Sequence, residues 1–155
     1  MKNKLGLLIL VALFAITPAY AQVVPIPVVV TGAGAATFGP GAALSGVSLS
    51  TMRFGIGVDL PGDGTASGDF QATLSAASRK IVVEGKASSG SKGLTATTFS
   101  GTCSVDLGDG SPITAGVPFT VSVATPAGGT PTLGLVIGTT TLPSAAVSAG
   151  AVRVK

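Results

Sequence analysis

The chain has 155 residues, of which 46% are hydrophobic and 10% are charged, with 23 Gly, 10 Pro, one Cys and no Trp or His. The lack of His excludes Ser-His-Asp and Cys-His catalysis and imidazole metal sites. The single Cys excludes zinc sites built from several thiolates.

The first 21 residues resemble a cleavable signal peptide. Lys2 and Lys4 form a basic start, residues 5–16 form an apolar stretch, and Ala19 and Ala21 supply small residues around a cleavage site. The apolar stretch is shorter than the roughly 20 residues that a membrane-spanning helix needs. We therefore expect export to the periplasm or the medium, cleavage near Ala21, and no membrane span in the mature chain.

Residues 22–30 form an apolar lead-in segment in which Pro25 and Pro27 suit an edge strand or a tether. The rest, residues 31–155, is expected to be one domain. Gly32 to Gly34 and Gly39 to Gly41 are interpreted as turns, because no Gly-Lys-Ser/Thr follows them as a phosphate-binding loop requires.

Alternation of apolar and polar residues predicts an all-β fold. Met52, Phe54, Ile56 and Val58 share one face of a strand, and Phe70, Ala72 and Leu74 repeat the pattern. Further strands are predicted at 81–85, 94–100, 103–107, 117–123, 132–137 and 146–154, separated by turn sequences at 61–64, 88–93, 108–110 and 125–131.

About nine short strands at this spacing predict a single antiparallel β-sandwich. The alternative, an outer-membrane barrel, would need aromatic girdles. Beyond the leader, which contains Tyr20, Phe is the only aromatic residue type.

The order of several segments resembles a group of secreted bacterial β domains without assigned function. The segments are Val30 to Gly34, Ala96 to Cys103, Val117 to Val121 and Gly150 to Val154. The resemblance implies secretion and a β-sandwich. Such domains usually carry an acidic Asp-x-Gly loop after the Phe-Thr-Val segment, but residues 125–130 contain no carboxylate here.

Two loops combine Asp with Gly: one with Asp59 and Asp63, the other with Asp106 and Asp109. Such oxygen-rich loops can bind calcium, which takes six to eight oxygen ligands, and Asp69 could join the first loop. Asp-Gly is also the preferred pair for a tight hairpin turn. These five carboxylates are calcium candidates, with ordinary turns as the alternative.

The sequence contains no strong candidate for a set of catalytic residues. A glycosidase would need a pair of carboxylates. Glu84 lies in the middle of a strand and is expected to face solvent, and the other five acidic residues are the Asp residues just named. The aromatic platforms of sugar-cleaving clefts are also missing. A Ser nucleophile would need Lys as its base, and Lys80 follows Ser78 in a turn. We therefore predict that the protein is not an enzyme.

Cys103 is an unpaired thiol in a chain expected to enter an oxidising compartment. It alternates with Val105 and Leu107, which indicates a buried position. The alternative is an intermolecular disulfide, and the resembling domains sometimes carry a second Cys downstream, where this chain has Val117 and Pro118.

These features predict an exported, non-enzymatic structural or interaction module, with an unidentified protein or cell-surface partner and possible self-association. Nucleic acid is excluded because the basic residues never cluster. The alternatives are a fimbria-like subunit that adds residues 23–30 as a strand to a neighbour's sheet, a weak calcium-binding module, and a binder of a small hydrophobic ligand between the sheets.

Overall fold

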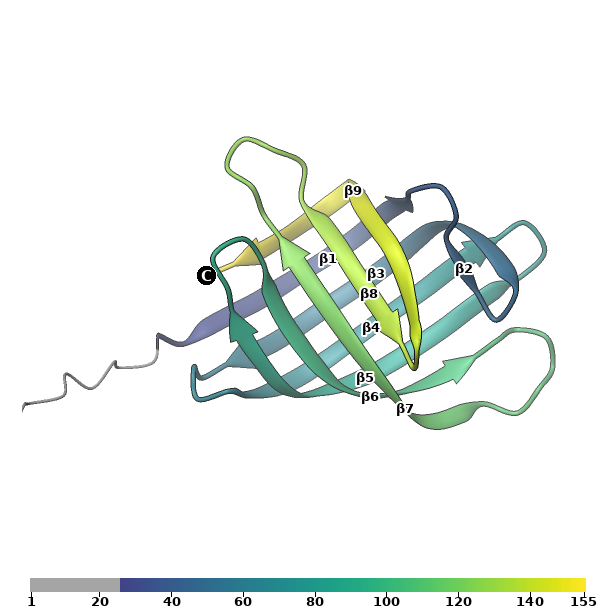
Figure 1. Cartoon of the computed structure of the whole chain (residues 1–155), viewed down its shortest axis with the longest axis horizontal. Helices are drawn as coiled ribbons and strands as arrows, with labels where there is room; N and C mark the ends of the chain where they lie inside the picture. Colours follow the sequence, from purple (N-terminus) through teal and green to yellow (C-terminus); the bar gives the residue numbers. More distant parts are fainter. Residues whose placement is uncertain (1–25) are drawn as a thin grey trace, which may run out of the picture.

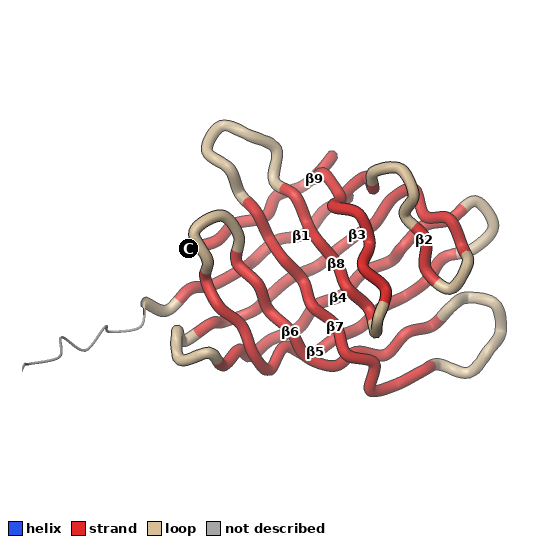
Figure 2. The backbone as a smooth tube through the Cα atoms, in the orientation of Figure 1, coloured by secondary structure: helices blue, strands red, loops and turns tan. Residues whose placement is uncertain are grey.

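The structure, a computed structural model, describes residues 26–155, in which all regular elements are strands (Figures 1 and 2). In chain order these are β1 (Val28–Phe38), β2 (Ala43–Leu44), β3 (Val47–Leu60), β4 (Thr65–Ala76), β5 (Lys80–Lys92), β6 (Thr97–Asp106), β7 (Thr114–Ala124), β8 (Thr132–Ile137) and β9 (Thr140–Val154). Among these described residues, no helix is long and apolar enough to cross a membrane. The all-β prediction is confirmed.

The prediction of a β-sandwich is wrong, because the sheet closes into an antiparallel barrel of eight strands. Each strand from β3 to β9 pairs with the next, and β1 closes the ring by pairing with both β3 and β9. The two-residue strand β2 extends the sheet beside β3. Alternation along a strand indicates which residues face the core but not how the first and last strands pair.

The barrel is flattened (Figure 1). Strands β1, β3, β4 and β5 form a rear layer, and β6, β7 and β8 cross in front of them. Strand β9 belongs to both layers: residues 140–146 pair with β8, and residues 145–154 pair with β1. The chain therefore turns the corner of the barrel within β9, near a register shift opposite Ala35 and Ala36.

The inward-facing side chains form one apolar core. Phe70, Phe99 and Phe119 lie at its centre, with Phe70 stacked on Phe119 at a centroid distance of 5.6 Å and edge-on to Phe99 at 6.1 Å. Such a cluster fills the interior of a small barrel with side chains. The outward positions of the same strands, such as Arg53, Gln71 and Glu84, are exposed and polar.

Strand β1 contains two sequence features that had suggested other structures. Gly32 and Gly34, interpreted above as a turn, lie in its middle, where a Cβ on either would collide with the backbone of β9. Glycine therefore permits a close approach between β1 and β9 here, so the turn prediction is wrong. Residues 28–30 of the lead-in segment also belong to β1, whereas residues 22–25 and the expected leader lie outside the described residues.

Other boundaries differ by a few residues. Strand β5 continues through the stretch 88–92 that was expected to be a loop, and residues 94–96 form the connection instead. The two strands predicted at 94–100 and 103–107 are one strand, β6, and the prediction of 132–137 is confirmed as β8.

Candidate functional site

The connections gather at the two ends of the barrel. The terminal end carries the first described residues, Lys155 and the turns at 61–64, 93–96 and 125–131. The opposite end, called the mouth here, carries the β2 hairpin at 39–46, the turn at 77–79, the loop at 107–113 and the turn at 138–139. Binding sites of barrels commonly lie among such connections.

A shallow, open cavity of about 250 Å³, with an apolar centre, lies at the mouth. Among the apolar residues that line it, Leu44, Val105 and Ile137 are buried, and Leu107 and Val117 are half-buried. The polar part of its rim consists of Ser45, Thr114, Thr139 and Thr140. The lining residues come from β2, β6, β7, β8, β9 and the connections beside them, so the cavity exists only when the barrel is closed.

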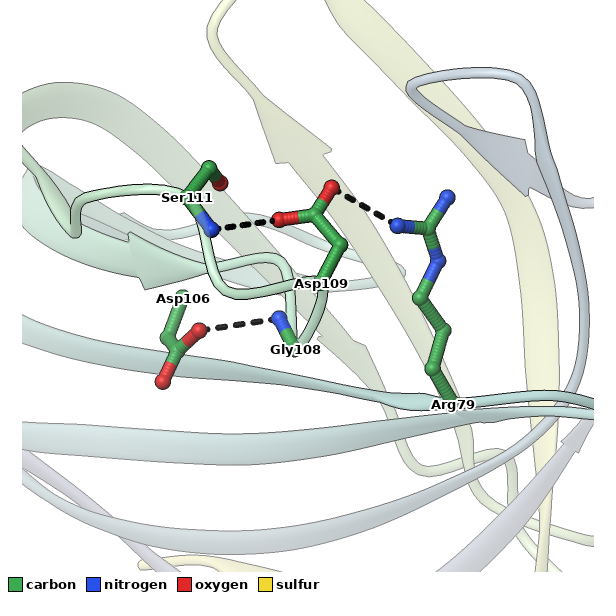
Figure 3. A network of polar contacts seen from close by, with 5 residues as sticks. All are labelled: Arg79, Asp106, Gly108, Asp109 and Ser111. Carbon is green, nitrogen blue, oxygen red and sulfur yellow. Dashed lines mark hydrogen bonds and ion pairs between the residues drawn. The ribbon is translucent and has the colours of Figure 1, made fainter.

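The loop at 107–113 forms one side of this mouth and is stabilised by its two carboxylates (Figure 3). Asp106 accepts a hydrogen bond from the Gly108 N–H at 2.8 Å, and Asp109 accepts one from the Ser111 N–H at 3.0 Å. These are local Asx-type turns, which Asp favours. Asp109 also pairs with Arg79 Nη1 at 2.7 Å, which joins the loop to the β4–β5 turn.

These contacts stabilise the charged form of Asp109. Hydrogen bonds from the Ser111 hydroxyl and N–H, followed by the charge of Arg79, hold the pKa of Asp109 below its usual value. Asp63 shows the same effect at the terminal end, where hydrogen bonds from the hydroxyl and N–H of Thr65 lower its pKa.

The two Asp-Gly loops lie at opposite ends of the barrel. Cross-strand pairing connects Asp106 on β6 to Val82 on β5, Val82 to Thr73 on β4, and Thr73 to Arg53 on β3. Asp106 therefore lies at the same height along the barrel wall as Arg53 on β3. Arg53 lies about six residues from Asp59 along that strand, which corresponds to about 20 Å at roughly 3.3 Å per residue. The two loops therefore cannot share one calcium ion.

The remaining calcium candidate, Asp69, faces outward from β4 and pairs with Lys86 at 3.1 Å. Within residues 26–155, no group of three or more His, Cys, Asp or Glu side chains lies close enough together to hold a metal ion. Asp63, Asp106 and Asp109 accept hydrogen bonds within their own turns, whereas Asp59 lies in β3.

Cys103 faces the interior of the barrel and is 4% exposed. Its β6 position lies between Gly85 on β5 and Val117 on β7. Burial raises the pKa of the Cys103 thiol, which disfavours the reactive thiolate. An intermolecular disulfide would therefore require the barrel wall to open.

A second, polar groove of about 360 Å³ runs over the outer wall of β4, β5 and β6. Asp69 and Lys86 line one side, and Gln71, Glu84 and Ser104 line the other. The Lys86 and Asp69 side chains are 84% and 68% exposed, so this ion pair is solvated and contributes little energy. Glu84 faces solvent, as expected from its alternation.

Sequence reasoning missed the mouth cavity, because its walls come from segments far apart in the chain. One signal was present: Ile113 is an isolated apolar residue in a polar loop, and the structure leaves it 62% exposed beside Thr114 of the rim. Comparison of the chain with protein-family models, curated proteins and solved structures finds no match.

Proposed function

We propose that this protein is an exported, non-enzymatic interaction module whose barrel mouth binds an apolar side chain of a partner protein. The observation that carries the proposal is the apolar cavity between Leu107 and Val117, rimmed by hydroxyl groups. An apolar centre with a polar rim is the arrangement expected of a protein-binding hot spot. Export rests on the signal peptide predicted at residues 1–21.

The size of the cavity favours a side chain over a free small molecule. Its volume of about 250 Å³ lies below the roughly 300–1,000 Å³ typical of small-molecule sites. Ile113 is exposed and directly precedes the rim residue Thr114 in the chain, so we place the partner's backbone beside it.

The loop beside the cavity is suited to binding because it is already ordered. Asp106, Asp109 and Arg79 form the contacts that shape residues 107–113 in the free protein. A preformed loop reduces the conformational entropy lost on binding. The same contacts engage these charged groups in structural roles, which supports a non-enzymatic function.

Selection of peptides from a random displayed library, followed by NMR mapping of the selected peptides, tests this proposal. We expect apolar peptides that shift the methyl signals of Leu107, Val117 and Ile137, and binding that is lost in Ile113→Asp. Leu94→Asp is the matched control, because Leu94 is an apolar loop residue at the terminal end that is even more exposed than Ile113. Peptides that map elsewhere, or that bind both variants equally, would overturn the proposal.

A further inference from the structure

The C-terminal part of β9 has a free edge. Beyond Ala146, β9 no longer pairs with β8, and the last backbone bond on that side joins the Val147 N–H to the Pro131 carbonyl. Residues 149–154 pair only with β1. In Figure 1 this part of β9 forms the upper border of the rear layer.

The register identifies which peptide groups point to this free edge. Val29 and Lys155 exchange both of their backbone hydrogen bonds, at 2.8 and 3.0 Å. Hydrogen-bonded pairs alternate along an antiparallel ladder, so Arg153, Ala151 and Ala149 also point their peptide groups toward β1. The N–H and C=O groups of Gly150, Val152 and Val154 therefore point away from it.

These three residues form a template for one more strand. Among the described residues, the hydrogen bonds beyond the strand ladders include none from the backbone of Gly150, Val152 or Val154. Their N–H and C=O groups are spaced as in any strand, and no proline interrupts residues 148–154. An unpaired edge of this kind binds an extended peptide through its backbone.

The segment 22–27 of the chain, Gln-Val-Val-Pro-Ile-Pro, has the complementary pattern. Its two prolines lie two residues apart, so in a strand they are on the same side, and that side lacks their two N–H donors. The opposite side keeps the N–H groups of Gln22, Val24 and Ile26. A residue before proline favours extended backbone, so the segment is suited to an edge strand in which Pro25 and Pro27 face solvent.

From this match we infer that residues 22–27 of a second copy of the chain add to the free edge of β9 as a further strand. The match of Gln22, Val24 and Ile26 to the three free positions of β9 depends only on alternation, so it holds for either strand direction. Within one chain the segment would have to pass round the end of β9, because residue 28 begins β1 and β9 pairs with β1 as far as Lys155. We therefore assign the added strand to a second copy. The inference goes beyond the mouth site and does not depend on it.

Two proline variants of the segment provide a matched test on the chain that begins at Gln22. In the proposed pairing, Val24→Pro removes an N–H that faces β9 and Val23→Pro removes one that faces away. Both residues precede β1, which begins at Val28. We expect sedimentation to show association that Val24→Pro weakens by about 2- to 10-fold or more, as the loss of one hydrogen bond implies, and that Val23→Pro leaves unchanged.

The receiving edge has its own test. Val154→Pro removes an N–H that points away from β1, so the β1–β9 hydrogen bonds should remain while association weakens. A thermal melt checks that the variant is still folded. Hydrogen exchange should protect the Val152 amide only at concentrations where the protein associates. A monomer at every concentration, equal effects of the two tail variants, unprotected Val152 in the associated form, or association that reductant abolishes would each overturn the inference.

Discussion

The ring of Phe119 lies directly over the Cα of Gly85: a Cβ at this glycine would come within 2.6 Å of Phe119 Cε1. Phe119 is 2% exposed and is held by Phe70, which stacks on it, and by Phe99. Gly85 therefore provides the space in the barrel wall that the central aromatic cluster needs.

Replacing Gly85 with Ala should destabilise the barrel. The added methyl group overlaps a buried ring that is fixed on two sides, so the core must expand, at a cost of about 1–3 kcal/mol. Urea unfolding of the purified protein measures this change in the free energy of unfolding. The matched control is Gly55→Ala on β3, where a Cβ meets nothing within 4 Å. There we expect no loss, or a gain of about 0.4–1 kcal/mol, and equal losses in both variants would contradict this role of Gly85.

The strands with regular alternation could be predicted from the sequence. Met52 to Val58 and residues 132–137 contain apolar side chains at every second position, and burial follows that pattern in β3 and β8. Strand β1 could not be predicted in this way, because Gly32 and Gly34 replace the side chains that would mark its pattern. Their role depends on β9, more than 100 residues away in the sequence.

Closure of the barrel and formation of the mouth are both long-range properties. Val30 pairs with Val58 on one side and with Val154 on the other, and no local pattern indicates these partners. Leu44 and Val117 likewise line one cavity although they come from distant segments. The Asp-Gly turns were recognisable because an Asx turn depends only on the next few residues.

Acid should weaken the mouth loop through Asp109. The pKa of Asp109 is lowered in the folded protein, so its contribution to stability is complete above the unfolded-state pKa and is lost as the pH falls through the folded value, below about pH 4. NMR titration of the Asp109 carboxyl carbon measures this pKa directly. We expect Ser111→Ala and Arg79→Gln each to raise the pKa, because each removes a side chain that stabilises the charged carboxylate. A carboxyl that titrates at its usual value in the unmodified protein would show that the loop contacts do not form in solution.

Cys103 should be inert in the folded protein. Its side chain lies inside the barrel and burial raises its pKa, so both access and thiolate content are reduced. We expect a thiol reagent such as Ellman's reagent to react slowly with the native protein and rapidly after urea unfolding. The solution mass should not depend on reductant.

Cys103→Ser should lower the free energy of unfolding by about 1–3 kcal/mol if its hydroxyl lacks a hydrogen-bond partner in the core, whereas Cys103→Ala should cost less because it introduces no polar group. Rapid labelling of the native protein, or a dimer that reductant dissociates, would instead place Cys103 at an exposed intermolecular contact.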